Sequence, residues 1–239
     1  MSETGHAKNT ANFEILTNVV TTLGSAYNPT NDELKLPNLS SIPSSAKPSL
    51  ASIQDVFSDW KDTTNQRELA FDSAEKLSTR AVSSFAVSGA DSLDVTDAKS
   101  FLRKMQGKRA KAKPEPKNAG EAIKTHSASQ TSFDNKTEHF AQVVSILANN
   151  PKHKPNEAEL QNDSLTNTLN DLRTKNTAVV NSSVSLANQR INRNQILYNT
   201  DHGLVKIAQD VKTYVKSVFG SASPQYKQIS GLAFKKQAV

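Results

Sequence analysis

Two stretches of this 239-residue sequence begin in the same way and lie 126 positions apart. Each has a proline, then a glutamate and a leucine four and five positions later, and a second leucine five positions after the first. Repetition at a fixed spacing means that one supersecondary unit is built twice. We therefore predict an internal duplication, so the fold must contain two similar units. The matched pairs are Pro29 and Pro155, Glu33 and Glu159, Leu34 and Leu160, and Leu39 and Leu165.

The same shift continues through one long amphipathic segment in each half. Apolar residues recur there at spacings of four and three, which places them on one face of an α-helix. Arg67 and Arg193 fall at equivalent positions, where each could be either a snorkelling side chain or half of a buried ion pair. The first stripe is Ile53, Phe57, Trp60, Thr64, Arg67, Phe71, Ala74, Ala81 and Phe85; the second is Leu165, Leu169, Leu172, Val179, Ser183, Leu186, Arg190, Arg193 and Leu197.

The predicted fold class is all-α. No segment alternates apolar and polar residues for long, and the sequence has no Asn-Gly or Asp-Gly hairpin turn. Only 36% of the residues are hydrophobic, so each stripe is narrow and needs a cover. We therefore predict a helical bundle built from two sequence-related helical units with pseudo-twofold symmetry.

Capping residues predict the ends of the helices. Helix ends are expected at Gly89 and Gly220. Residues 199–203 resemble a break between two helices, whereas their counterpart at 72–76 passes as continuous helix, so whether the chain folds back there stays open. The predicted starts are residues 30–33, Pro48–Ser49, Asp91 or alternatively Thr96–Asp97, and residues 156–157.

These boundaries predict four regions along the chain. Residues 1–12 are expected to form a flexible tail and residues 110–137 a flexible basic linker, because the linker is rich in Pro, Ala, Ser and Thr and has no helical stripe. The two helical repeats are residues 13–109 and 138–236. Since neither stripe can bury itself, we expect the repeats to pack together as one domain.

Three stretches of the sequence carry a resemblance to known proteins. They are the carboxyl-terminal run 214–232, which continues to residues 234–236, the stretch 106–114, and the Asn-Pro start at Asn28. Together they resemble a family of uncharacterised all-helical proteins of Bacteroidetes-type bacteria. The resemblance extends from about Phe13 to Lys236. It implies a duplicated helical fold, and it implies no activity and no catalytic residues.

Residue types that build catalytic and metal sites are missing or scattered. The chain has no cysteine, which excludes disulfides, thiol nucleophiles and thiolate metal sites. Its five histidines never pair at the i+3 or i+4 spacing, and no P-loop, G-x-S-x-G motif or dinucleotide fingerprint occurs. We therefore predict that the protein is not an enzyme, with no catalytic, metal or cofactor-binding residues, no cofactor and no small-molecule substrate.

The sequence also lacks targeting signals. Its first residues have neither the basic segment nor the apolar core of a signal peptide. No apolar run approaches the roughly 18 residues that a membrane span needs. These features predict a cytoplasmic protein that does not contact a membrane.

Residues 103–117 carry a net positive charge as large as that of the whole chain. They contain seven basic residues and one acidic residue, a balance of +6 that equals the net charge of the whole sequence. Such a segment could bind the phosphates of a nucleic acid through counterion release, or it could serve only to keep a linker soluble. The candidate nucleic-acid contacts are Arg103, Lys104, Lys108, Arg109, Lys111, Lys113 and Lys117.

Four aromatic residues crowd the last 26 positions of the chain, alternating with lysines. They could pack a terminal helix against the core, or they could form an exposed surface for a partner protein. The candidate partner residues are Tyr214, Phe219, Tyr226 and Phe234.

Two functions of different classes follow from these observations. The first is a non-enzymatic helical scaffold or assembly protein that binds itself or another protein. The alternative is a non-specific nucleic-acid-associated protein that acts through residues 103–117. Interleaved aromatics for base stacking, which would favour the alternative, are absent from that segment.

Overall fold

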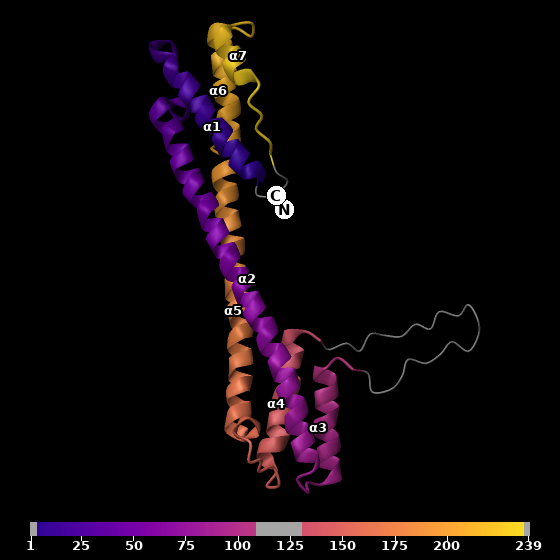
Figure 1. Ribbon diagram of the computed structural model, residues 1–239. Coiled ribbons are helices and arrows are strands. Elements are labelled where there is room, and N and C mark those ends of the chain that lie inside the picture. The colour runs from indigo at the N-terminus through magenta and orange to yellow at the C-terminus, as the bar shows by residue number, and fades with distance from the viewer. Residues whose placement is uncertain (1–3, 109–130, 237–239) are drawn as a thin grey trace, which may run out of the picture. The chain divides into compact units, whose positions relative to one another are not determined.

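The computed structural model describes residues 4–108 and 131–236, and every regular element among them is a helix (Figure 1). This confirms the predicted all-α class. No helix in these two ranges is long and apolar enough to cross a lipid bilayer. The α-helices are α1 (Thr4–Thr22), α2 (Leu36–Ala86), α3 (Ser92–Met105), α4 (Phe133–Asn149), α5 (Asn162–Tyr198), α6 (Leu204–Phe219) and α7 (Pro224–Ser230); the short 3-10 helices are η1 (Gly24–Ala26), η2 (Asp32–Leu34) and η3 (Ala158–Leu160).

The chain divides into two compact units. Unit 1 consists of Met1–Trp60 and Ser182–Val239, and unit 2 consists of Lys61–Asn181. Both α2 and α5 therefore contribute residues to each unit. This division does not follow the predicted repeats 13–109 and 138–236, because each unit takes helices from both halves of the sequence.

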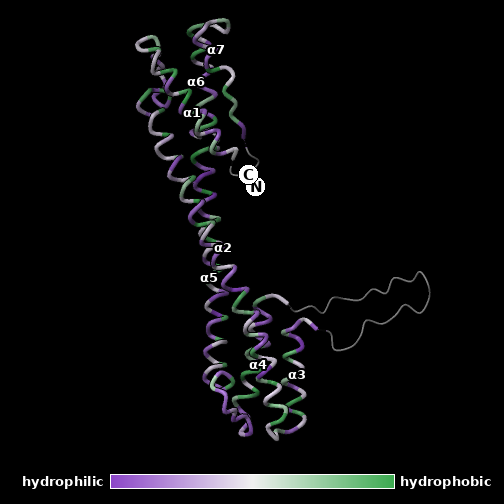
Figure 2. Tube along the Cα trace, viewed as in Figure 1, coloured by the Kyte–Doolittle hydropathy of each residue, from purple (hydrophilic) through white to green (hydrophobic). Residues whose placement is uncertain are grey.

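Unit 1 has its own hydrophobic core. It is built by α1, the first part of α2, the end of α5, α6 and α7. Hydrophobic and hydrophilic residues alternate within the turns of these helices (Figure 2), as expected when one face is buried and the other is exposed. The buried residues are Phe13, Leu16, Val20, Tyr27, Leu34, Leu39, Ala46, Leu197, Leu204, Val205, Ile207, Ala208, Val211, Val215 and Ile229.

The start of α1 corrects the predicted flexible tail. Residues 4–12 are helical, and His6, Asn9 and Thr10 are buried. The spacing of apolar residues does not reveal this part of the helix, because the side chains on its buried face are polar. The Thr10 hydroxyl donates to the carbonyl of His6, and the other two side chains bond groups on α5 and at the end of the chain.

Helix α2 begins twelve residues before the predicted start at Pro48, at Leu36, and runs through two prolines, Pro43 and Pro48. Each proline removes one backbone hydrogen bond and normally ends or kinks a helix. Here Leu39, Ala46 and Ile53 are buried at intervals of seven residues on either side of both prolines. This packing supplies the stability that the lost hydrogen bonds remove.

Unit 2 has a second core, formed by the end of α2, by α3 and α4, and by the start of α5. Asp91 caps α3 by accepting from the amide of Leu93 at 2.8 Å, so the first of the two predicted starts of this helix is correct. Its buried residues are Phe71, Ala74, Ala81, Val82, Phe85, Ala98, Met105, Phe140, Val143, Val144, Leu147, Leu160, Leu165, Leu169 and Leu172.

Helix α4 starts inside the region predicted as linker. Ser132 accepts a hydrogen bond from the amide of Asn135, and the helix begins at Phe133, whereas the linker was predicted to reach residue 137. A serine cap followed by an aromatic residue is an ordinary helix start, which the surrounding Ser- and Thr-rich composition concealed. Residues 109–130 of that linker lie outside the described residues.

The chain breaks after α5, which answers a question that the sequence left open, and α2 is continuous through Asp72. The side chain of Asn199 accepts from the amides of Asp201 and His202 at 2.9 and 3.0 Å, which turns the chain out of the helix. Gly203 is required here, because a β-carbon would lie 2.5 Å from the backbone of Asn199. Helix α6 ends at Gly220, whose φ of +88° only glycine adopts easily.

A ring side chain fixes each of the short helices η2 and η3. The hydroxyl of Tyr27 donates to the carbonyl of Leu34 at 2.7 Å in unit 1. In unit 2, Nε2 of His153 donates to the carbonyl of Leu160 at 3.1 Å. A carbonyl can only accept, so Nε2 of His153 carries the proton. Both rings are buried.

Candidate functional site

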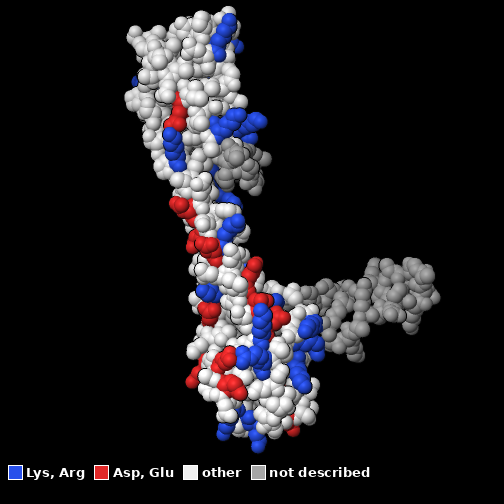
Figure 3. Space-filling view, in the orientation of Figure 1, with Lys and Arg blue, Asp and Glu red and all other residues white. Residues whose placement is uncertain are grey.

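The described part of the basic segment lies at the end of α3. Arg103 and Lys104 are in the last turn of that helix, and Lys108 is exposed just beyond it. Figure 3 shows Lys and Arg side chains over this part of unit 2. The remaining candidates, Arg109, Lys111, Lys113 and Lys117, lie outside the described residues.

Both candidate residues on α3, Arg103 and Lys104, also have local contacts. A guanidinium nitrogen of Arg103 donates to the Ser100 hydroxyl at 3.2 Å, and the Lys104 ammonium lies 4.9 Å from the centre of the Phe101 ring. Positive charge in the last turn of a helix interacts favourably with its dipole. The positions of Arg103 and Lys104 are therefore accounted for by the fold, and nucleic-acid binding by this segment stays a prediction.

The four terminal aromatic residues are half-buried and pack against the core of unit 1. Tyr214 meets the ring of Tyr27 edge-on at a centroid distance of 5.3 Å, and its hydroxyl accepts from the amide of Asn28. None of Tyr214, Phe219, Tyr226 and Phe234 stands free in solvent. The structure thus gives them a packing role, and their role toward a partner stays a prediction.

The two arginines at equivalent positions of the predicted stripes, Arg67 and Arg193, lie in different units. The guanidinium of Arg67 lies 3.9 Å from the centre of the Phe133 ring and donates to the side chain of Asn176. Arg193 is 4% exposed and donates twice to the side chain of Asn194. Both arginines therefore bond an asparagine side chain. Neither predicted alternative, a snorkelling side chain or a buried ion pair, included such a partner.

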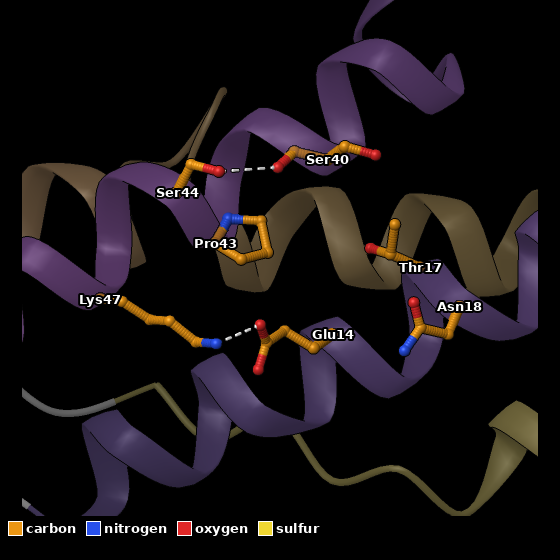
Figure 4. Close-up of a pocket in the computed structure, with 7 residues that line it drawn as sticks. All are labelled: Glu14, Thr17, Asn18, Ser40, Pro43, Ser44 and Lys47. Atoms are coloured by element: carbon orange, nitrogen blue, oxygen red, sulfur yellow. Dashed lines mark hydrogen bonds and ion pairs between the residues drawn. The ribbon is translucent and has the colours of Figure 1, made fainter.

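A polar pocket of about 370 Å³ lies between α1 and α2 in unit 1 (Figure 4). Lys47 and Glu14 form an ion pair across it at 2.5 Å, and Pro43 forms part of its wall. The hydroxyls of Thr17 and Ser44 donate to backbone carbonyls of their own helices. The charges of this pocket are thus paired with each other, and the hydroxyl protons of Thr17 and Ser44 are engaged by the backbone.

An apolar surface on α5 was missed by the sequence analysis. Val184 and Ile191 are 54% and 60% exposed, and Ala187 lies exposed between them. Their spacings of three and four residues place them on one face of the helix. We call these three residues the α5 surface. The signal that could have found it is the absence of any charged residue between Lys175 and Arg190.

The α5 surface continues into a hollow of about 300 Å³ in unit 1. Ile191 and Tyr198 line it, together with polar side chains of the end of α5 and the turn that follows. The Tyr198 hydroxyl lies 2.6 Å from Nδ1 of His6, which is buried. This pair joins the end of α5 to the start of α1 and positions the wall of the hollow.

Comparisons with family models, with curated proteins and with solved structures gave no match. The resemblance to a Bacteroidetes-type family therefore stays a prediction. Within residues 4–108 and 131–236, no group of three or more His, Asp or Glu side chains is arranged to hold a metal ion.

Proposed function

We propose that this protein is an internally duplicated, non-enzymatic helical scaffold that assembles with a second copy of itself through the α5 surface. The observation that carries the proposal is the exposure of Val184 and Ile191 on one face of a helix, with Ala187 between them. Two aliphatic side chains at this spacing form the kind of face that a partner helix covers.

The positions of the helices support the duplication. Helices α2 and α5 start at Leu36 and Asn162, which keeps the spacing of 126, and each follows a short 3-10 helix. The ring contacts to Leu34 and Leu160 come from residues 27 and 153, again 126 apart. Helix α2 has 51 residues and α5 has 37, a difference of 14 that corresponds to two heptads.

The surroundings of the α5 surface favour a second copy as its partner. The sequence from Asn176 to Gln189 has no charge, so Val184 and Ala187 have no charged neighbour in the sequence that would repel a second copy, and Ile191 follows directly after Arg190. Antiparallel pairing about Ala187 places Val184 of one copy near Ile191 of the other, and the small alanine lets the helices approach closely. A twofold interface uses the same surface on both chains, as this pairing does.

An introduced cysteine tests the pairing directly, because the chain has none of its own. Ala187→Cys is expected to form a disulfide-linked dimer under mild oxidation, since twofold pairing brings the two copies of position 187 together. The measurement is the fraction of dimer on a non-reducing gel.

Ala51→Cys is the matched control, since Ala51 is also an exposed alanine of unit 1, on α2. It is expected to give little dimer at the same protein concentration. Equal cross-linking of the two variants would show that random collisions form the disulfide and would overturn the proposed pairing.

A second candidate function is nucleic-acid binding by residues 103–117, and the observation that favours it is their charge of +6. Binding to duplex DNA is expected to weaken steeply with salt, with a logarithmic slope of about −0.9 for each phosphate neutralised. Replacing Lys108, Arg109, Lys111 and Lys113 by glutamine is expected to abolish binding. Fluorescence anisotropy between about 50 and 200 mM salt measures both effects. Affinity that is insensitive to salt would exclude this function.

A further inference from the structure

The segment that follows α7 is held in an extended conformation against α1. Asn9 bonds Lys235 twice: its amide group donates to the carbonyl of Lys235 at 2.8 Å, and its oxygen accepts from the amide of Lys235 at 3.1 Å. One helical turn later on α1, Asn12 donates to the carbonyl of Ala233 at 2.8 Å. In Figure 1 the yellow segment runs back from α7 to the start of α1.

The Asn9 side chain is placed to bind the backbone of an extended segment. Asn9 is 2% exposed, and its side chain pairs with the amide and carbonyl of one residue as a neighbouring β-strand would. Contacts of this kind depend on the backbone of the bound segment and on its conformation, and they place no demand on the Lys235 side chain.

The segment is also held from α6, at two further points. The ammonium of Lys212 on α6 donates to the carbonyls of Ser230 and Leu232, at 2.9 Å each. The ring of Phe234 packs against the core of unit 1, 5.9 Å from the same ammonium. Leu232 packs against the same core, so the segment is held by two apolar side chains as well as by its backbone.

We propose that α1 and α6 together form a binding site for an extended peptide in which an aromatic residue stands two positions after an aliphatic one, as Phe234 stands after Leu232. Residues 232–236 occupy it within the chain, and the corresponding segment of a second copy is its ligand in trans. The site uses none of the residues of the α5 surface, so it provides a second and independent contact between copies.

The intramolecular segment competes strongly with a ligand in trans. A tethered segment has an effective concentration of about millimolar, so an added peptide gains access only when the tethered segment is weakened. Phe234→Ala achieves this in the full-length chain, because it removes the aromatic anchor and leaves Asn9, Asn12 and Lys212 in place.

The test uses a fluorescent peptide with the sequence of residues 231–239 and the full-length protein. The Phe234→Ala chain is expected to bind the peptide at least tenfold more tightly than the wild-type chain, as measured by anisotropy. Adding Asn9→Ala to Phe234→Ala is expected to abolish the gain. Adding Asn18→Ala, which changes an exposed asparagine of the same helix, is expected to leave the gain unchanged.

Circular dichroism verifies that each variant retains its helices, and hydrogen exchange supplies a second measurement that needs no peptide. In the wild-type chain the amide of Lys235 is expected to be protected, and Asn9→Ala is expected to reduce that protection at least tenfold. Absence of peptide binding by a folded Phe234→Ala chain, or binding that Asn9→Ala does not weaken, would overturn the proposed site.

Discussion

Phe13→Ala is expected to lower the free energy of unfolding of unit 1 by about 3–5 kcal/mol, the usual cost of deleting a buried phenylalanine ring. Phe13 is fully buried in the core that α1 forms with α6. Because a domain of this size has a total stability of about 5–15 kcal/mol, the loss removes a large part of it. Urea denaturation and hydrogen exchange of α1 and α6 measure the effect.

Ile15→Ala is the matched control for this prediction. Ile15 lies two residues away on the same helix, but its side chain is 48% exposed, so a loss below about 1 kcal/mol is expected. Similar losses for the two variants would mean that the buried face of α1 has been wrongly assigned.

Acid is expected to destabilise unit 2, because it holds two buried histidines. Burial lowers the pKa of His153, and burial together with the Lys104 ammonium lowers the pKa of His139. Nε2 of His139 is buried without a hydrogen-bond partner among the described residues. The folded state therefore binds these protons less readily than the unfolded state, where the pKa is about 6.5. Stability is full above that pH and falls as the pH drops through the lowered values.

A reciprocal exchange isolates the contribution of His153. His153→Tyr introduces the residue that unit 1 has at Tyr27, and it is expected to remove most of the acid sensitivity due to this site. Tyr27→His is expected to make unit 1 acid-sensitive, because its buried position would then hold a histidine. Hydrogen exchange of η2 and η3 between about pH 7 and pH 4 measures both effects.

The same exchange shows how this prediction could fail. If His153→Tyr destabilises unit 2 equally at neutral and acidic pH, the ring size matters and the protonation does not. If the wild-type chain loses no protection at η3 on acidification, burial of His153 in the folded state is contradicted.

The helices with apolar stripes and ordinary caps could be predicted from the sequence. Helix α6 buries Ile207, Val211 and Val215 on one face and ends at Gly220, both of which the spacing and the glycine indicate. At Asn199 the sequence left a break and a continuous helix both open, although Asn, Asp and Gly together favour the turn that the structure has. These elements are specified by their local sequence.

The elements that could not be predicted depend on distant contacts. The first turns of α1 are buried through His6 and Asn9, whose partners Tyr198 and Lys235 lie more than 180 residues away. Pro48 indicates a helix start in isolation, and only the packing of α2 on both sides of it allows the helix to continue. The local sequence around residues 4–12 and around Pro48 contains no information about these distant contacts.

Of the candidate sites, one could likewise be predicted from the local sequence and one could not. Charge alone indicated the basic segment, because a local excess of lysine and arginine needs no knowledge of the fold. The α5 surface needed the fold, since Val184 and Leu186 are both aliphatic residues of one helix and only the structure shows that the first is exposed and the second buried.

The mass of the protein in solution tests the central claim, assembly of two copies through the α5 surface. Light scattering on a sizing column is expected to give a mass that rises with concentration toward twice 26.0 kDa. The double variant Val184→Asn, Ile191→Asn is expected to stay at 26.0 kDa with an unchanged helical circular dichroism spectrum. A wild-type chain that stays monomeric up to about 100 μM, well above the micromolar affinity of a weak interface, would contradict the account.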